Sequence, residues 1–287
     1  MTDPESVPAE SDGAHTKPSA ATQIARVVER ERKTVARTRT FAILGIGFTA
    51  VVLGLAWASG GTSGGYVPTV VGLLTPLELL VPILAMAFGY RAITGDADRG
   101  ELDVLQTYPI SAHQHVLGVY IGRAIGLLAV ILASLALVAI AVVFLRTEPI
   151  GWYASHASTD SPILFARFAV LTALFAVAIL AVAIAISAVA REARTVLALA
   201  VATLVVVLVG LDLALVYGLA SGVIGEGSLI HAIAFSPLSA YRGLVFESVV
   251  VTAAGTGPQT AAPLSSVVGL LTWTIGSLAV ATLAVRR

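Results

Sequence analysis

The chain has 287 residues, of which 57% are hydrophobic and only 12% are charged, and its 17 basic and 17 acidic residues cancel. Soluble domains carry about 25% charged residues, so this composition predicts an all-α polytopic membrane protein. The absence of Cys excludes disulfides, thiolate metal sites and a catalytic thiol.

The N-terminal region divides into two parts. Residues 1–23 are rich in Pro, Ser, Thr and acidic residues, and we expect a disordered tail because such a segment cannot offset its ordering entropy by burial. Over residues 24–40, apolar residues recur at near-helical spacing among six basic ones. This pattern favours a basic amphipathic helix lying in the membrane interface, with a solvated charge run as the alternative. The apolar positions are Ile24, Val27, Val28 and Val35.

Six apolar segments follow, each close to the roughly 20 residues that cross about 30 Å of hydrocarbon. Of the 17 Lys and Arg residues, 14 lie before the first segment, in or beside residues 91–118, in the turn 191–194, or at the C-terminus. The positive-inside bias therefore predicts a multi-pass protein of the cell membrane with both termini cytoplasmic. The expected spans are Phe41–Ala58, Pro68–Tyr90, Val119–Leu145, Ile163–Ala190, Thr195–Leu219 and Leu264–Val285.

The outer connection 220–263 contains its own apolar stretch, residues 229–250, interrupted by Ser236 and Pro237. A seventh span here would place the C-terminal arginines outside and would bury Arg242. We expect instead a helix or helical pair that re-enters the outer leaflet. Such an element is tolerated only where protein or water covers its backbone.

Three charged residues fall inside the expected spans: Glu78, Asp212 and Arg167. An intramembrane carboxylate costs several kcal/mol unless it is paired, protonated or hydrated. One interpretation is a substrate or proton path through Glu78 and Asp212, and the other is an interhelical ion pair or hydrogen bond with Arg167. Pro76 and Pro82 flank Glu78 and free backbone carbonyls there, which favours a local site.

The longest charged interruption is the 91–118 segment. Its apolar residues predict two short amphipathic helices separated at Pro109, because the residue before a proline resists the helical conformation. Ser111 is placed to cap the second helix, with the third span following. An element of this kind either lies on the membrane surface or fits a groove of a partner.

Motif searches exclude several functions. The chain has no GxxxxGK[ST] phosphate loop, so we expect it to carry no ATPase of its own. The His-Glu-x-x-His pattern of zinc hydrolases is also absent. We expect no catalytic role, and no metal pair at His113 and His115, because two residues two apart lie on different faces of a helix. We also expect no metal site elsewhere and no nucleic-acid partner.

The 91–118 segment resembles the cytosolic loop of the ABC-2 type permease family. That loop has a glutamate, Gly-Thr-Leu, Pro-Val-Ser-Arg and Gly-Lys. Here Asp96 stands for the glutamate, Gly100-Glu101-Leu102 and Pro109-Ile110-Ser111 for the next two motifs, and Gly118 for the last glycine. A second stretch, Ser236 to Arg242, is similar to the Asn-Pro-x-x-x-Phe/Tyr-Arg segment of the branch that serves nitrous-oxide-reductase maturation. The departures from the family pattern are Glu101, Ala112 and Val119.

The resemblance implies a six-span permease subunit that forms a homodimer above two separate ATPase subunits. ATP and Mg²⁺ would bind the ATPase, and this chain would bind no cofactor. Membrane lipid and an extracytoplasmic protein are further implied partners. The resemblance also implies that the loop receives the ATPase motion, with Glu101, Tyr108 and Pro109 foremost at the interface. The full set is Asp96, Arg99, Gly100, Glu101, Leu102, Leu105, Tyr108, Pro109, Ile110 and Ser111.

Two other functions stay open. A proton-coupled secondary transporter would use Glu78 and Asp212, although the sequence has no evident internal repeat of the kind such folds often show. A membrane-embedded lipid-modifying enzyme would use Asp96, Asp98 and Asp103 with Mg²⁺, although these are fewer aspartates than such enzymes need.

Overall fold

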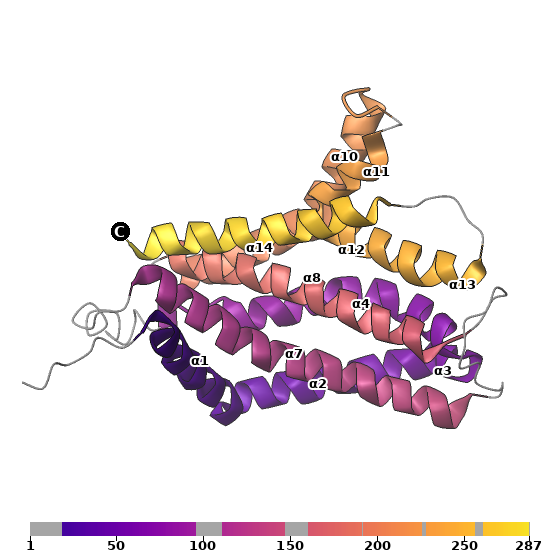
Figure 1. The fold of residues 1–287 in the computed structure, drawn as a ribbon, viewed down its shortest axis with the longest axis horizontal. Helices are drawn as coiled ribbons and strands as arrows, with labels where there is room; N and C mark the ends of the chain where they lie inside the picture. Colours follow the sequence, from indigo (N-terminus) through magenta and orange to yellow (C-terminus); the bar gives the residue numbers. More distant parts are fainter. Residues whose placement is uncertain are drawn as a thin grey trace, which may run out of the picture.

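The protein is all-helical in the computed structural model, which describes residues 19–95, 111–146, 160–190, 192–225, 228–255 and 261–286. Within those ranges there is no β-strand. Helices α2, α4, α7, α8 and α14 run along one long axis, whereas α10 and α11 project away from it (Figure 1). The C-terminus, α1 and the beginning of α7 lie at the same end. Most of the expected tail, residues 1–18, lies outside the described residues.

Six helices are long and apolar enough to cross a membrane, as the sequence predicts. This confirms a multi-pass membrane protein. They begin and end within a few residues of the expected spans, except that the third begins seven residues earlier at Ala112. They are α2 (Arg39–Ala58), α4 (Tyr66–Gly89), α7 (Ala112–Leu145), α8 (Pro162–Val189), α9 with η1 and α10 (Ala193–Ala220) and α14 (Pro263–Val285).

The start of α7 corrects one expectation. Ser111 does cap a helix, because its side chain accepts from the Gln114 amide while the Gln114 side chain accepts from the Ser111 amide. However, no separate short helix follows. The helix continues unbroken to Leu145 because it contains no proline, and its glycines lie against another helix.

That other helix is α1 (Ala20–Arg37). Its C-cap is Thr38, two residues before the predicted end of the helix. Its buried face packs on the glycine row of α7: the Cβ atoms of Val27 and Glu31 lie where side chains at Gly118 and Gly122 would have to be. Only glycine permits so close an approach. The apolar face of α1 therefore meets protein, and the interfacial location of this helix stays a prediction.

The opposite end of the bundle is closed by Asp160. Its carboxylate accepts from the backbone N–H groups of Tyr66 and Val67 at 2.9 and 2.7 Å, which caps the start of α4. Arg146 forms an ion pair with Asp160 at 3.3 Å, and so ties the end of α7 to the same point. Gly65 has a φ of 114°, and its lack of a Cβ makes room for the carboxylate.

The outer connection 220–263 holds short helices between α10 and α14. They include α11 (Leu229–Ala232), the 3₁₀ turn η3 (Ile233–Phe235), α12 (Pro237–Val245), the π-helical η4 (Phe246–Val251) and α13 (Thr252–Ala254). None of the spanning helices lies in this region. Re-entry into the outer leaflet stays a prediction.

Candidate functional site

The candidate site is centred on α12, which begins at a proline as short helices often do. Ser236 is the N-cap, with its hydroxyl accepting from the Ser239 amide at 3.2 Å, and Pro237 occupies the first turn. Seven of its nine residues are buried, and Arg242 is the only charged residue in the helix.

Arg242 of α12 holds Glu78 of α4 in a two-pronged ion pair. The Arg242 Nε donates to Glu78 Oε1 at 2.7 Å, and a second guanidinium nitrogen donates to Oε2. The Glu78 side chain is 6% exposed and that of Arg242 is 44% exposed, so the pair opens to the surface on the arginine side. The pair thus gives a carboxylate inside a span the partner that burial in a membrane requires.

Asp212 of α10 lies against the other end of α12. Its Oδ1 accepts from the hydroxyls of Ser236 at 2.6 Å and Ser239 at 2.8 Å. The charge of Asp212 reaches the same arginine: the pKa of Arg242 is raised chiefly by its hydrogen bond to Glu78, and the Asp212 charge acts in the same direction. The two acidic residues that the sequence singles out therefore lie at opposite ends of one helix.

Between these ends, Tyr241 anchors α12 to α8. Its ring is fully buried and stacks on Phe175 with centroids 4.7 Å apart and planes 3° apart. Its hydroxyl is hydrogen-bonded to that of Thr172 at 2.9 Å. Together with the bonds to Glu78 and Asp212, this contact fixes α12 to three spans.

Arg167 does not take part, so the alternative of an ion pair with Glu78 is wrong. Its guanidinium donates instead to the backbone carbonyl of Ser248 in η4 at 3.2 Å. Sequence reasoning missed Arg242 as the true partner because it placed this residue in the outer connection. The available signal was the motif ending in Tyr241-Arg242, which marks both side chains that anchor α12.

The predicted ATPase interface lies almost wholly outside the described residues. Of its ten members only Ser111 is described, as the N-cap of α7. The other nine are Asp96, Arg99, Gly100, Glu101, Leu102, Leu105, Tyr108, Pro109 and Ile110. The described residues on either side of this segment, however, make specific contacts.

On the α4 side, Ser187 of α8 fastens the chain just before the segment. Its hydroxyl accepts from the Ile93 and Thr94 amides at 3.0 and 3.1 Å, and the Thr94 hydroxyl donates to the Ser187 carbonyl at 2.6 Å. Both hydroxyl-bearing residues are buried. Residues 93–94 are thus fixed to the end of α8.

On the α7 side, Arg123 joins four helices. It donates to the Glu31 carboxylate of α1 at 2.7 Å and to the Phe88 carbonyl near the end of α4 at 3.0 Å, and it lies 5.2 Å from the ring centroid of Phe41 in α2. Only 11% of the arginine side chain and 3% of the glutamate side chain are exposed. The residues just before the segment, and α7 about three turns after its start, are therefore held by buried polar contacts.

Comparison with known proteins agrees with this architecture. The model of the ABC-2 family transporter protein matches residues 8–287, and the chain belongs to that family. Among curated proteins it is similar to the probable ABC transporter permease protein NosY of Stutzerimonas stutzeri, with 28% identity over 43% of this chain and 46% of the relative. The protein of the same name from Pseudomonas aeruginosa is 32% identical over 39% of this chain and 42% of the relative. The chain thus spans less than half the length of either relative. The expected family is confirmed.

Proposed function

We propose that this chain is the permease subunit of an ATP-binding-cassette transporter, driven by a separate ATPase subunit. The family match over nearly the whole chain and the six spanning helices support this proposal. The sequence carries no phosphate loop, so ATP and Mg²⁺ would be bound by the partner. A homodimer with two ATPase subunits, and an extracytoplasmic protein as a further partner, follow from the family resemblance.

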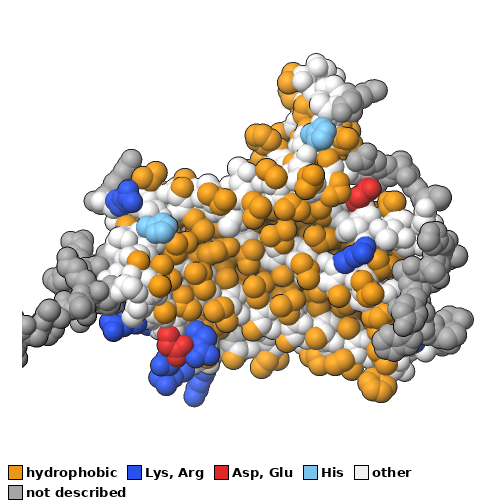
Figure 2. Space-filling model, in the orientation of Figure 1, with side chains coloured by type: hydrophobic (Ala, Val, Ile, Leu, Met, Phe, Trp, Pro, Cys, Tyr) orange, Lys and Arg blue, Asp and Glu red, His pale blue; other side chains and the backbone are white. Residues whose placement is uncertain are grey.

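The distribution of basic residues supports cytoplasmic termini. Several Lys and Arg side chains gather at the end of the molecule where α1 lies (Figure 2). Glu29 forms ion pairs with two of them, Arg32 and Lys33, and hydrogen bonds from Lys33 first and Arg32 second lower the pKa of Glu29. Arg37 and Arg39 are exposed beyond these pairs, where they can contact anionic lipid phosphates at the cytoplasmic surface.

The observation that carries the proposal is that buried polar contacts hold the chain on both sides of residues 96–110. A push on this segment by an ATPase would be passed through Thr94 and Ser187 to α8, and through Arg123 to α1 and α4. Loops without such contacts would absorb the motion themselves. The arrangement supports a role for the segment as the coupling element, with Glu101, Tyr108 and Pro109 at the interface.

The cluster around α12 supports a structural role for Glu78 in place of proton transport. Both carboxylate oxygens of Glu78 accept hydrogen bonds from the Arg242 guanidinium, so the side chain is engaged in holding α12 against α4. We propose that the cluster locks α12 against α4, α8 and α10, and that α12 moves only together with these spans. The aspartates that a lipid-modifying enzyme would use, Asp96, Asp98 and Asp103, lie outside the described residues.

The first test is co-expression with a candidate ABC ATPase subunit, followed by co-purification in detergent and an ATPase assay. We expect the double variant Leu102→Asp/Leu105→Asp to insert in the membrane but to lose the ATPase, because charges replace the apolar face of the segment. Unchanged co-purification of the double variant would show that this face does not bind the ATPase.

The second test separates assembly from coupling. Ser187→Ala removes the acceptor of two buried N–H groups beside the segment, and we expect the complex to form with reduced stimulation of ATP hydrolysis. Ser134→Ala is the matched control, since Ser134 is also buried and bonds between spans, to Thr49 at 2.7 Å, but belongs to the middle of α7. Equal effects of the two variants would contradict the coupling route through Ser187.

A further inference from the structure

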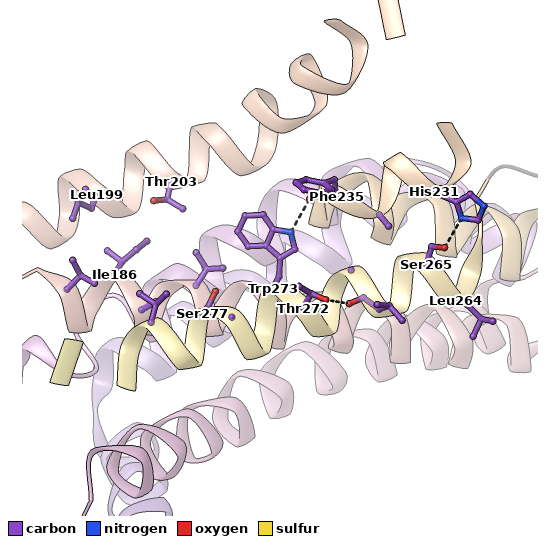
Figure 3. A pocket seen from close by; sticks show the side chains of 18 residues that line it. Ile186, Leu199, Thr203, His231, Phe235, Leu264, Ser265, Thr272, Trp273 and Ser277 are labelled. Carbon is purple, nitrogen blue, oxygen red and sulfur yellow. Dashed lines mark hydrogen bonds between the residues drawn. The ribbon is translucent and has the colours of Figure 1, made fainter. Parts of the chain in front are cut away.

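A cleft of about 930 Å³ opens between α8, α9 and α14. Ile186, Leu199, Thr203 and Ser277 face it from three helices, and Trp273 and Phe235 lie toward its other end (Figure 3). Its volume is at the upper end of the range for sites that hold small molecules, about 300–1,000 Å³. We call it the α9–α14 cleft.

Four of the polar side chains in its wall already have partners. The Trp273 indole N–H donates to a backbone carbonyl of η3 at 3.0 Å, and the Thr272 hydroxyl donates within its own helix at 2.8 Å. His231 Nδ1 and the Ser265 hydroxyl are bonded to each other at 2.8 Å. The remaining lining is mainly aliphatic, so the cleft suits an apolar occupant.

The cleft is flanked by the two least buried spans. Only 17% of the most apolar stretch of α9–α10 and 11% of that of α14 are buried. Along α14 the lining runs from Leu264 to Val280, which at 1.5 Å per residue is about 24 Å, most of the roughly 30 Å of a bilayer core. A cleft of this length, bounded by lipid-facing helices, matches an extended acyl chain.

One end of the cleft also carries positive charge. Arg194 lies five residues before Leu199 on α9, and Arg286 lies six residues after Val280 on α14, so each is about 8–9 Å beyond the lining. Both are exposed. At the far end, the only titratable lining residue is His231. The charge is therefore placed for a phosphate at one end of an apolar chain.

We propose that the α9–α14 cleft binds one acyl chain of an anionic glycerophospholipid, whose phosphate is held by Arg194 and Arg286. The lipid fills space that the chain leaves unpacked between α9, α14 and the α8 surface, and so supplies the missing contacts. The proposed orientation puts the phosphate in the cytoplasmic leaflet. The inference takes this side of the membrane from the proposed function and depends on that function in nothing else.

The test uses fluorescence of Trp273 in the full chain, with the two other tryptophans removed as Trp57→Phe and Trp152→Phe. The protein is reconstituted in phosphatidylcholine vesicles that contain increasing amounts of phosphatidylglycerol brominated in its acyl chains, which quench nearby indoles. We expect saturating quenching at a mole fraction roughly tenfold lower than brominated phosphatidylcholine requires, given two arginines near the surface. Arg194→Gln/Arg286→Gln should remove that difference.

Gly276→Leu blocks the cleft, because Gly276 lines it and has open space where a side chain would stand. Gly54→Leu is the matched control: it adds the same side chain in open space on α2, away from the cleft. We expect Gly276→Leu to abolish the saturable quenching and Gly54→Leu to leave it unchanged. Quenching that follows the bulk lipid fraction for both lipids, or that survives Gly276→Leu, overturns the proposal.

A second copy of the chain is the competing occupant. It would exclude lipid, so Trp273 would show no saturable quenching, and Ser277→Cys would form a disulfide-linked dimer in membranes of this otherwise Cys-free chain. That pair of results also overturns the proposal. The lipid assay contains no ATPase, so its failure leaves the proposed transport function separately testable.

Discussion

The α8 helix and the α9–α10 span are both strongly apolar, yet they differ sharply in what surrounds them. In the most apolar stretch of α8, 61% of residues are buried within the chain, and 56% in α4, against 17% for α9–α10 and 11% for α14. The molecule therefore combines two spans that the chain itself largely encloses, α4 and α8, with two that leave most of their surface uncovered, α9–α10 and α14. Apolar composition sets which segments enter the membrane, whereas small residues and buried polar pairs determine which of them pack together.

The difference in burial between the two regions is tested most directly by making the same substitution in both. Ile179→Ala in α8 removes a fully buried side chain and should lower the free energy of unfolding by about 2–5 kcal/mol, since it leaves a cavity. Ile275→Ala in α14 removes a side chain that is 66% exposed to lipid, and should cost less than about 0.5 kcal/mol. Both variants are compared by SDS titration in mixed micelles. Equal losses would mean that α14 is covered by another protein surface.

The second expected effect concerns the tie between α12 and the bundle. Arg242→Gln leaves the Glu78 carboxylate buried without its cation, and we expect a loss of about 3 kcal/mol in the same titration. Because the penalty comes from the unpaired charge, Glu78→Gln/Arg242→Gln should recover much of it. If the double variant is as unstable as the single one, the pair itself, and not an uncompensated charge, stabilises the fold.

The sequence predicts the six spans well, because length and apolar composition are local properties. It does not predict the partners of Glu78 and Asp212, since Arg242 is 164 positions from Glu78, and Ser236 and Ser239 are 24 and 27 positions from Asp212. Counting Lys and Arg by loop assigns Arg242 to one side of the membrane but says nothing about its contacts. The resemblance motif identified Tyr241 and Arg242, although not what they bind.

The packing of α1 on α7 could have been predicted from the spacing of residues in the two helices. Gly118, Gly122 and Gly126 recur every four residues, and so do Val27 and Glu31. Two rows with the same spacing, one small and one bulky, indicate close helix packing. The amphipathic pattern alone predicted a helix correctly but left its apolar face for the membrane, where α7 provides the actual partner.

The third prediction tests that packing. A Cβ at Gly122 would lie 2.4 Å from the Glu31 Cβ, so Gly122→Leu must displace α1 and break the bond between Glu31 and Arg123. We expect a loss of about 1–3 kcal/mol and earlier cleavage within α1 in limited proteolysis. Gly54→Leu, in open space on α2, should change neither measurement. Unaltered proteolysis of Gly122→Leu would show that α1 does not depend on the glycine row.

The smallest effect should be found at Tyr241, and it distinguishes the packing of α12 from its polar bonds. Tyr241→Phe keeps the ring on Phe175 but removes the hydroxyl, and Thr172 retains its bond to the Phe168 carbonyl at 2.8 Å. Since no donor is left unpaired, the loss should be only about 1 kcal/mol. Tyr241→Leu, which also removes the stacked ring, should cost more than Tyr241→Phe. If the two variants are equally unstable, the Tyr241 hydroxyl and not its ring anchors α12. Helix α12 would then be held against the neighbouring spans by its polar bonds alone.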